Sequence, residues 1–337
     1  MAAKWKMHPN NKTSDLEKVS PQQAKVLEMQ KAYADAFSTS ATSSYAEMRA
    51  AYREERKMWN SGGPVMAVSQ DIAVPFGEDG STFNVRLLRP TEEPNLPILF
   101  FIHGGGFVEG DNDTHGLIQR KLAAYSGCAV VGIDYSLSPE VQYPRAVEEC
   151  YTAVLYMTSH AAEYGLDASR IGFSGDSGGA NLSMATTVYL RDHGFDNSVL
   201  KANLLYYGAY GLESSVTHKL HGGPWDGMEE TDLDFYWKLY LGDQDPLDCP
   251  YYDLYLNDLT YGVPPCFIVA AELDPLCDDS KLLYTILTSK GNPCVFREYA
   301  GALHAFLHYS KVMDDAEDAL RRGAHFFAEK CGLDPRN

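Results

Sequence analysis

Long apolar segments are missing from this sequence of 337 residues. A helix that crosses a membrane needs about 20 consecutive apolar residues, and no run approaches that length. Residues 1–13 are polar and lack the apolar core that marks a secretory signal. We therefore expect a cytoplasmic protein that makes no use of a membrane.

Paired cysteines are missing too. The seven cysteines stand singly, and none forms a C-x-x-C pair (Cys128, Cys150, Cys249, Cys266, Cys277, Cys294 and Cys331). An odd number of scattered cysteines suggests neither a disulfide framework nor a zinc site. The expected state is buried free thiols in a reducing compartment, with no metal.

Positive charge is scarce. The sequence has 28 Lys and Arg against 46 Asp and Glu, a formal net charge of −18. This balance repels phosphate backbones and leaves no basic stripe for nucleic acid or anionic lipid. A solvated acidic surface is the simplest interpretation, and nucleic acid is excluded as an expected partner.

What is present is an alternation of short apolar segments and longer amphipathic stretches. With 45% hydrophobic residues, the chain has enough apolar material for one large core. The short segments read as buried strands at residues 97–102, 129–133, 171–173, 202–206 and 267–271. Strands that alternate with helices predict an α/β fold with a mostly parallel central sheet, flanked by helices.

The first sixty residues carry helix signals and no strand alternation. Ser20 and Ser44 each begin a capping pattern, which predicts helices over residues 20–37 and from Ser44 to the Gly-rich stop at 61–64. Tyr45, Met48 and Trp59 fall on one face of the second helix, so this face needs a partner, for which we expect the mouth of the following domain. We divide the chain into a helical cap segment, 1–62, and a catalytic domain, 63–337, with a pocket-shaping insertion near 208–252.

The most informative motif is Gly175-Asp176-Ser177-Gly178-Gly179, directly after a predicted strand. A serine between glycines occurs at the nucleophile of α/β-hydrolases, on a sharp turn from strand to helix. The same letters occur in chymotrypsin-like proteases, which are all-β. Apolar residues then recur at helical spacing over residues 180–192, and this favours the α/β-hydrolase fold.

A serine hydroxyl needs a base, an orienting carboxylate and donors for the oxyanion. His103-Gly104-Gly105-Gly106 follows the predicted strand 97–102, where glycines let backbone N–H groups point into a cavity. We predict Gly104 and Gly105 as donors, together with Gly178. A glycine-rich turn made only for close packing has the same letters, but the serine downstream favours the oxyanion interpretation.

The acid and the base are expected later in the chain, each after a strand. Asp274 follows the strand 267–271 and is the best acid, ahead of the nearby carboxylates Glu272, Asp278 and Asp279. His304 follows a strand predicted at 294–299, and His308 is its main rival. The order serine, aspartate, histidine is that of the α/β-hydrolases.

Taken together, these motifs resemble the hormone-sensitive-lipase-like esterase family. The resemblance rests on the His103 and Ser177 motifs, on Asp274-Pro275-Leu276 and on His304-Ala305-Phe306. Within the family, the similarity is closest to the enterobacterial acetyl esterases and covers most of the chain beyond about residue 46. Two features depart from the family pattern: Gly178 stands where alanine is usual, and serines stand at 136 and 138.

The resemblance implies two-step hydrolysis of esters with short acyl chains, acetyl to butyryl, without a cofactor and beneath an N-terminal cap. Phe107, Tyr206 and Trp225 are the predicted pocket walls. Two alternatives stay open: a small-molecule-binding or protein-regulatory role on the same scaffold, and an amidase or lactonase with the same triad. The predicted partner is a small ester; a homodimer or a protein partner is left open.

Overall fold

The computed structural model describes residues 12–34, 44–212, 214–334 and 336. Their strands form one sheet in the order β1-β2-β4-β3-β5-β6-β7-β8. β1 and β2 pair antiparallel, β2 and β4 also pair antiparallel, and all later pairs are parallel. The strands are β1 Val68–Phe76, β2 Ser81–Arg89, β3 Leu96–Ile102, β4 Ala129–Asp134, β5 Leu166–Asp176, β6 Leu200–Tyr206, β7 Cys266–Ala271 and β8 Val295–Tyr299. The predicted α/β-hydrolase fold is confirmed.

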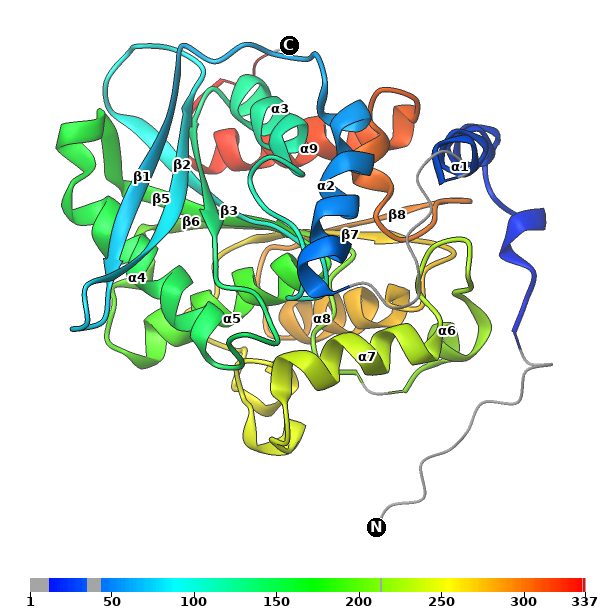
Figure 1. The fold of residues 1–337 in the computed structure, drawn as a ribbon. Helices are drawn as coiled ribbons and strands as arrows, with labels where there is room; N and C mark the ends of the chain where they lie inside the picture. Colours follow the sequence, from blue (N-terminus) through cyan, green and yellow to red (C-terminus); the bar gives the residue numbers. More distant parts are fainter. Residues whose placement is uncertain (1–11, 35–43, 213, 335, 337) are drawn as a thin grey trace.

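Helices cover both faces of this sheet (Figure 1). The α-helices of the described residues are α1 Pro21–Ala34, α2 Tyr45–Asn60, α3 Gly116–Ser126, α4 Arg145–Ser159, α5 Gly178–Asp192, α6 Val216–Leu220, α7 Glu230–Leu241, α8 Cys277–Ser289 and α9 Asp314–Lys330. α4 and α5 lie on one face and α3 and α9 on the other (Figure 1). In the described residues, no helix is long and apolar enough to cross a bilayer.

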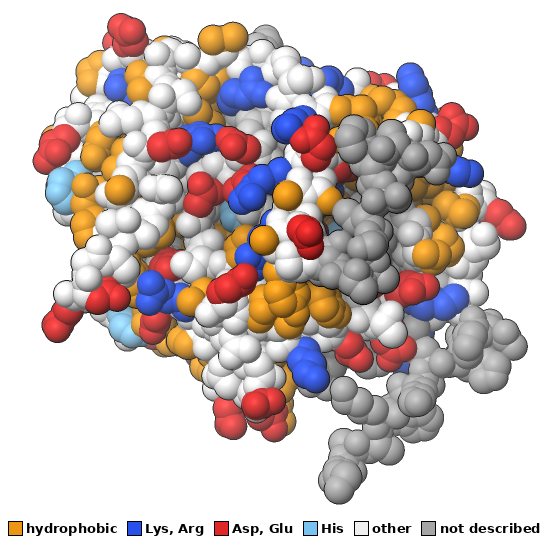
Figure 2. Space-filling model, in the orientation of Figure 1, with side chains coloured by type: hydrophobic (Ala, Val, Ile, Leu, Met, Phe, Trp, Pro, Cys, Tyr) orange, Lys and Arg blue, Asp and Glu red, His pale blue; other side chains and the backbone are white. Residues whose placement is uncertain are grey.

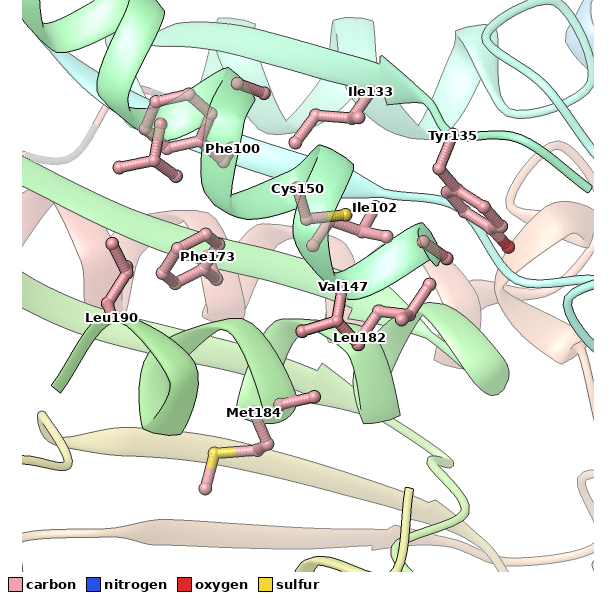
Figure 3. Packing of buried hydrophobic residues seen from close by; sticks show 14 of the residues in the cluster. Phe100, Ile102, Ile133, Tyr135, Val147, Cys150, Phe173, Leu182, Met184 and Leu190 are labelled. Atoms are coloured by element: carbon pink, nitrogen blue, oxygen red, sulfur yellow. The ribbon is translucent and has the colours of Figure 1, made fainter. Parts of the chain in front are cut away.

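The core is double because strand residues alternate between the two faces. Phe100 of β3 pairs in register with Phe173 of β5, and their ring centroids lie 5.8 Å apart. Figure 3 shows both rings on the side of the sheet that α4 and α5 cover. There they belong to one buried cluster with Val147 and Cys150 of α4 and Leu182 of α5. The neighbours Leu99 and Phe101 point the other way and pack beneath α3 and α9. Each such fully buried side chain contributes roughly 1.5–3 kcal/mol of transfer free energy.

Polar details of the sequence also fit the fold. Ser20 accepts a hydrogen bond from the Gln23 N–H at the start of α1, and Ser44 and Glu47 form the predicted capping box of α2. α1 ends at Ala34, and the rest of the predicted helix, to residue 37, lies outside the described residues.

All seven cysteines are free, and six are buried. Acidic and basic side chains are interspersed over the face drawn in Figure 2.

The described residues of the region 208–252 contain two α-helices that its Gly-rich sequence did not predict, α6 and α7. α7 packs against the loop that follows β3. Its Tyr240 stacks on Phe107 with a centroid distance of 3.9 Å, and its Tyr236 lies so close that a Cβ on Gly106 would be 2.4 Å from the ring. This insertion therefore covers the outer side of the His103–Phe107 segment.

Candidate active site

Ser177 stands on the turn between β5 and α5. Its φ is 53° and its ψ is −124°, a region that residues with a Cβ rarely adopt and that costs roughly 1–3 kcal/mol. The glycines around it are needed for space: a Cβ on Gly175 would lie 2.3 Å from the Gly179 carbonyl oxygen, and one on Gly179 would lie 2.0 Å from that of Ile102. The predicted strained turn is therefore present.

Three residues from three separate loops meet at this turn. His304 Nε2 lies 2.9 Å from Ser177 Oγ, and His304 Nδ1 lies 2.7 Å from Asp274 Oδ2. A carboxylate only accepts, so Nδ1 carries the proton and Nε2 is left to accept from the serine hydroxyl. Asp274 is fully buried, and its other oxygen accepts from the Leu276 N–H.

The charge of Asp274 governs the basicity of His304. Burial alone lowers the pKa of an imidazole, but the negative charge and the hydrogen bond of Asp274 outweigh it, so the pKa of His304 is raised above its ordinary value. Asp226 and Asp176 act in the same direction. The imidazole is thus prepared to accept a proton.

The rival residues have other partners. Glu272 accepts from the Gly301 N–H and Asp278 from the Thr217 N–H, so both brace loops. Asp279 is buried and accepts from two backbone N–H groups, at Tyr210 and Leu212. The other histidine candidate, His308, lies beneath the turn, with Nε2 at 3.8 Å from Asp176 Oδ2.

The glycine loop differs from the prediction at one position. The Gly104 N–H donates to Asp176 Oδ1 at 3.1 Å, so it is not free to bind an oxyanion. Among the described residues, the N–H groups of Gly105 and Gly106 have no acceptor. The Gly106 nitrogen is also only 3.6 Å from where a Cβ on Gly178 would stand. At this turn the N–H groups left without an acceptor in the described part of the chain are therefore those of Gly105 and Gly106, and the Gly104 N–H is already bonded.

His103 braces this loop from inside. Its Nδ1 donates to the Gly104 carbonyl at 2.9 Å, its ring stacks on Tyr135, and the Tyr135 hydroxyl donates to the His103 carbonyl. Burial and the nearby His115 lower the pKa of His103 to about 4, so its ring is neutral at pH 7.

The three residues predicted as pocket walls differ in where their side chains lie. Phe107 lies at the turn, where its ring would be 3.4 Å from a Cβ on Gly178. Trp225 is partly exposed, and its neighbour Asp226 acts electrostatically on His304. Tyr206 is misassigned as a wall, because its fully buried hydroxyl points at Gly323 of α9 in the core. The next residue, Tyr207, is the one that faces His304, with ring centroids 5.0 Å apart.

The N-terminal helices supply contacts that the sequence analysis missed. Arg49 of α2 donates to the Val108 and Ser138 carbonyls, beside the glycine loop. Gln23 of α1 accepts from the Leu303 N–H, next to His304. Trp59, from the predicted apolar face of α2, is buried against Tyr309. No local sequence pattern signals Gln23 or Arg49, because their partners are distant in the chain.

Comparisons with known proteins agree with this geometry. A family model described as an alpha/beta hydrolase fold matches residues 99–308, more than half of the chain. The chain belongs to this family, and the predicted hormone-sensitive-lipase-like relationship is confirmed.

Solved structures of esterases resemble it over nearly their whole length. A hyperthermophilic esterase from the archaeon Pyrobaculum calidifontis is 28% identical, with a TM-score of 0.82, and the match covers 93% of this chain and 99% of that one. A thermophilic carboxylesterase from a metagenomic library is 28% identical, with a TM-score of 0.80, covering 87% and 99%. A fungal esterase from Rhizomucor miehei is 28% identical, with a TM-score of 0.82, covering 94% and 98%. The predicted enzyme class, carboxylic ester hydrolase, is confirmed.

Proposed function

We propose that this chain is a serine carboxylesterase for esters of short acyl chains, acetyl to butyryl, with Ser177 as nucleophile, His304 as base and Asp274 as the orienting acid. The observation that carries the proposal is the continuous hydrogen-bond line from Asp274 Oδ2 through the His304 ring to Ser177 Oγ. It is the arrangement by which a neutral hydroxyl becomes a nucleophile at neutral pH.

The reaction proceeds in two acyl-transfer steps. Ser177 Oγ attacks the ester carbonyl carbon while its proton passes to His304 Nε2. When the tetrahedral intermediate collapses, the same proton goes to the departing alcohol, and the acyl group remains on Ser177. Water then gives a proton to His304 and attacks the acyl-enzyme, and the proton returns to Ser177 as the acid leaves. Asp274 stays ionised and stabilises the imidazolium in each step.

The oxyanion is held by the N–H groups of Gly105, Gly106 and Gly178. Support for Gly106 in place of Gly104 comes from the bond between the Gly104 N–H and Asp176, which fixes the loop. The Gly178 N–H is the first of α5, and the N–H groups of a first helical turn have no partner within the helix. One donor of this kind typically contributes about 2.7–4 kcal/mol of transition-state stabilisation.

The preference for short chains is inferred from the crowding of the site. We propose that residues 1–62 cap it, because Arg49 of α2 binds the Val108 carbonyl, beside the glycine loop, and Gln23 of α1 binds the His304 loop. The α7 side is closed by the stacked rings of Phe107 and Tyr240. Aromatic walls that are already packed leave little room for a long acyl tail.

Hydrolysis rates for p-nitrophenyl esters from acetyl to decanoyl test both parts of the proposal. We expect the highest kcat/KM between acetyl and butyryl and a steep decline beyond, since longer tails have to displace packed rings. Absence of hydrolysis with every ester would contradict the esterase assignment. A maximum at long chains would contradict only the capped, short-acyl pocket. Matched ester and amide substrates distinguish an esterase from an amidase.

Replacing Gly178 with alanine, the usual residue of the family, is expected to stabilise the protein without loss of activity. Its backbone does not need a glycine, and an added Cβ would stand 3.4 Å from the Phe107 ring, an ordinary contact. A gain of about 0.4–1 kcal/mol in the free energy of unfolding follows from the smaller freedom of the unfolded chain. Urea denaturation measures it. Gly179→Ala is the matched control, and it should destabilise strongly, because its Cβ would overlap the Ile102 carbonyl oxygen. If Gly178→Ala is less stable than the wild type, the Phe107 ring cannot move to accommodate the added Cβ.

A further inference from the structure

A second group of chemically active side chains lies beneath the nucleophile turn, and none of them touches the substrate in the proposed mechanism. His115 precedes α3, Asp176 ends β5, and His308 belongs to a short 3-10 helix, Phe306–Tyr309. One ligand atom from each lies within 4.8 Å of the others. The three residues are 0%, 2% and 4% exposed, respectively.

The His115 imidazole has an unused nitrogen at the centre of this group. Its Nδ1 is held by the Thr114 hydroxyl at 3.0 Å. Its Nε2 lies 3.4 Å from Asp176 Oδ1, but the contact lacks hydrogen-bond geometry, and this fully buried atom has no hydrogen-bond partner among the residues that the structure describes. Buried polar atoms without a partner are rare and costly, so a ligand at this point would remove a real penalty.

We propose that His115, Asp176 and His308 form a binding site for a divalent transition-metal ion, with Zn²⁺ as the best fit. Two imidazoles and a carboxylate are a zinc ligand set, whereas Mg²⁺ and Ca²⁺ prefer oxygen alone. The Thr114 hydroxyl on Nδ1 is the kind of outer contact that orients a ligating histidine.

The distances suit an ion of this size. Zinc bonds of about 2.1 Å at tetrahedral angles place ligand atoms about 3.4 Å apart. His115 Nε2 is 3.4 Å from Asp176 Oδ1, and His308 Nε2 is 3.8 Å from Asp176 Oδ2. The two imidazole nitrogens lie within 4.8 Å of each other. Asp176 Oδ1 also accepts from the Gly104 N–H, so the ion and the glycine loop share this carboxylate.

One nearby charge opposes a cation. The buried Arg56 guanidinium acts electrostatically on His308. Its charge is partly balanced by Glu55, whose carboxylate lies 3.3 Å from Arg56 Nε. The carboxylate of Asp176 offers the ion one negatively charged ligand atom. We therefore expect a 2+ ion to be held by direct bonds to its ligands and not by long-range attraction.

Metal-stripped protein titrated with ZnCl₂ by calorimetry, and with CoCl₂ by visible absorption, tests the site. We expect one equivalent bound by the wild type and by His304→Gln, and a thermal midpoint that rises with zinc because only the folded chain has the site. His115→Gln and His308→Gln should each lose both effects. Stoichiometric binding that persists in both His115→Gln and His308→Gln would overturn the site. Loss of binding in His304→Gln alone would also overturn it, because the metal would then lie at the catalytic histidine.

Buried histidine variants sometimes fail to fold, so a measurement on the unaltered protein completes the test. X-ray absorption at the zinc edge of the wild type loaded with one equivalent should show two imidazoles and one carboxylate oxygen. A spectrum with fewer than two imidazoles, or no binding of either metal by the wild type, would disprove the assignment whatever the variants do.

Discussion

Ser177→Ala is expected to reduce kcat for p-nitrophenyl acetate by on the order of 10⁶-fold, the loss found when the serine of other Ser-His-Asp enzymes is removed. Alanine has no atom to carry the acyl group, while the oxyanion donors of Gly105, Gly106 and Gly178 remain. A residual rate above that of water should therefore survive. Stability should change little, since alanine has the same Cβ as serine and keeps the strained backbone at φ 53°.

Ser169→Ala is the matched control for this substitution. Ser169 lies in the same strand, β5, and is exposed, with its hydroxyl bonded to Asp167. Its rate should equal that of the wild type. Equal rates for Ser177→Ala and the wild type would refute the assigned nucleophile, and with it the proposed mechanism.

Asp274→Asn is expected to lower kcat by about 10⁴-fold. An amide N–H₂ can turn toward His304 Nδ1, which then holds the ring with its proton on Nε2, and that tautomer cannot accept the Ser177 proton. The charge that raises the pKa of His304 is lost as well. Because activity needs the neutral ring, the acidic limb of the kcat/KM profile should move to lower pH in the variant.

The control for this carboxylate is Asp278→Asn, four residues further on. Asp278 lies in the first turn of α8 and only accepts from the Thr217 N–H, so its loss should affect stability modestly and leave the pH profile unchanged. An acidic limb that does not move in Asp274→Asn, or one that moves equally in Asp278→Asn, would show that another group sets the basicity of His304.

Local signals were sufficient for the residues at strand ends. Ser177, Asp274 and His304 each follow a strand that could be predicted from apolar runs, and parallel strands bring their carboxyl ends to one edge of the sheet. Position relative to the strand ends favoured Asp274 over Glu272 and His304 over His308. The structure brings these three residues together in hydrogen-bond contact.

Side-chain direction was the part that the sequence could not supply. Gly104 was favoured over Gly106 because nothing in the motif shows that the Asp176 carboxylate takes the Gly104 N–H. Tyr206 is predicted as a wall and Tyr207 is not, because the facing of residues reverses with one step along a strand, and the sequence does not show that Tyr207 leaves the strand at φ 40°. The glycine-rich composition of residues 208–252 likewise hid α7, which is held by contacts with the glycine loop.

The contact between α1 and the His304 loop has a consequence for biosynthesis. Gln23 and Leu303 are 280 residues apart in the chain, and Ser20 bonds to the same loop at Gly301. On the ribosome α1 is made 280 residues before the loop that it binds. The helix must therefore wait, undocked, through most of translation. The His304 loop gains this support only when α1 docks on residues 301–303.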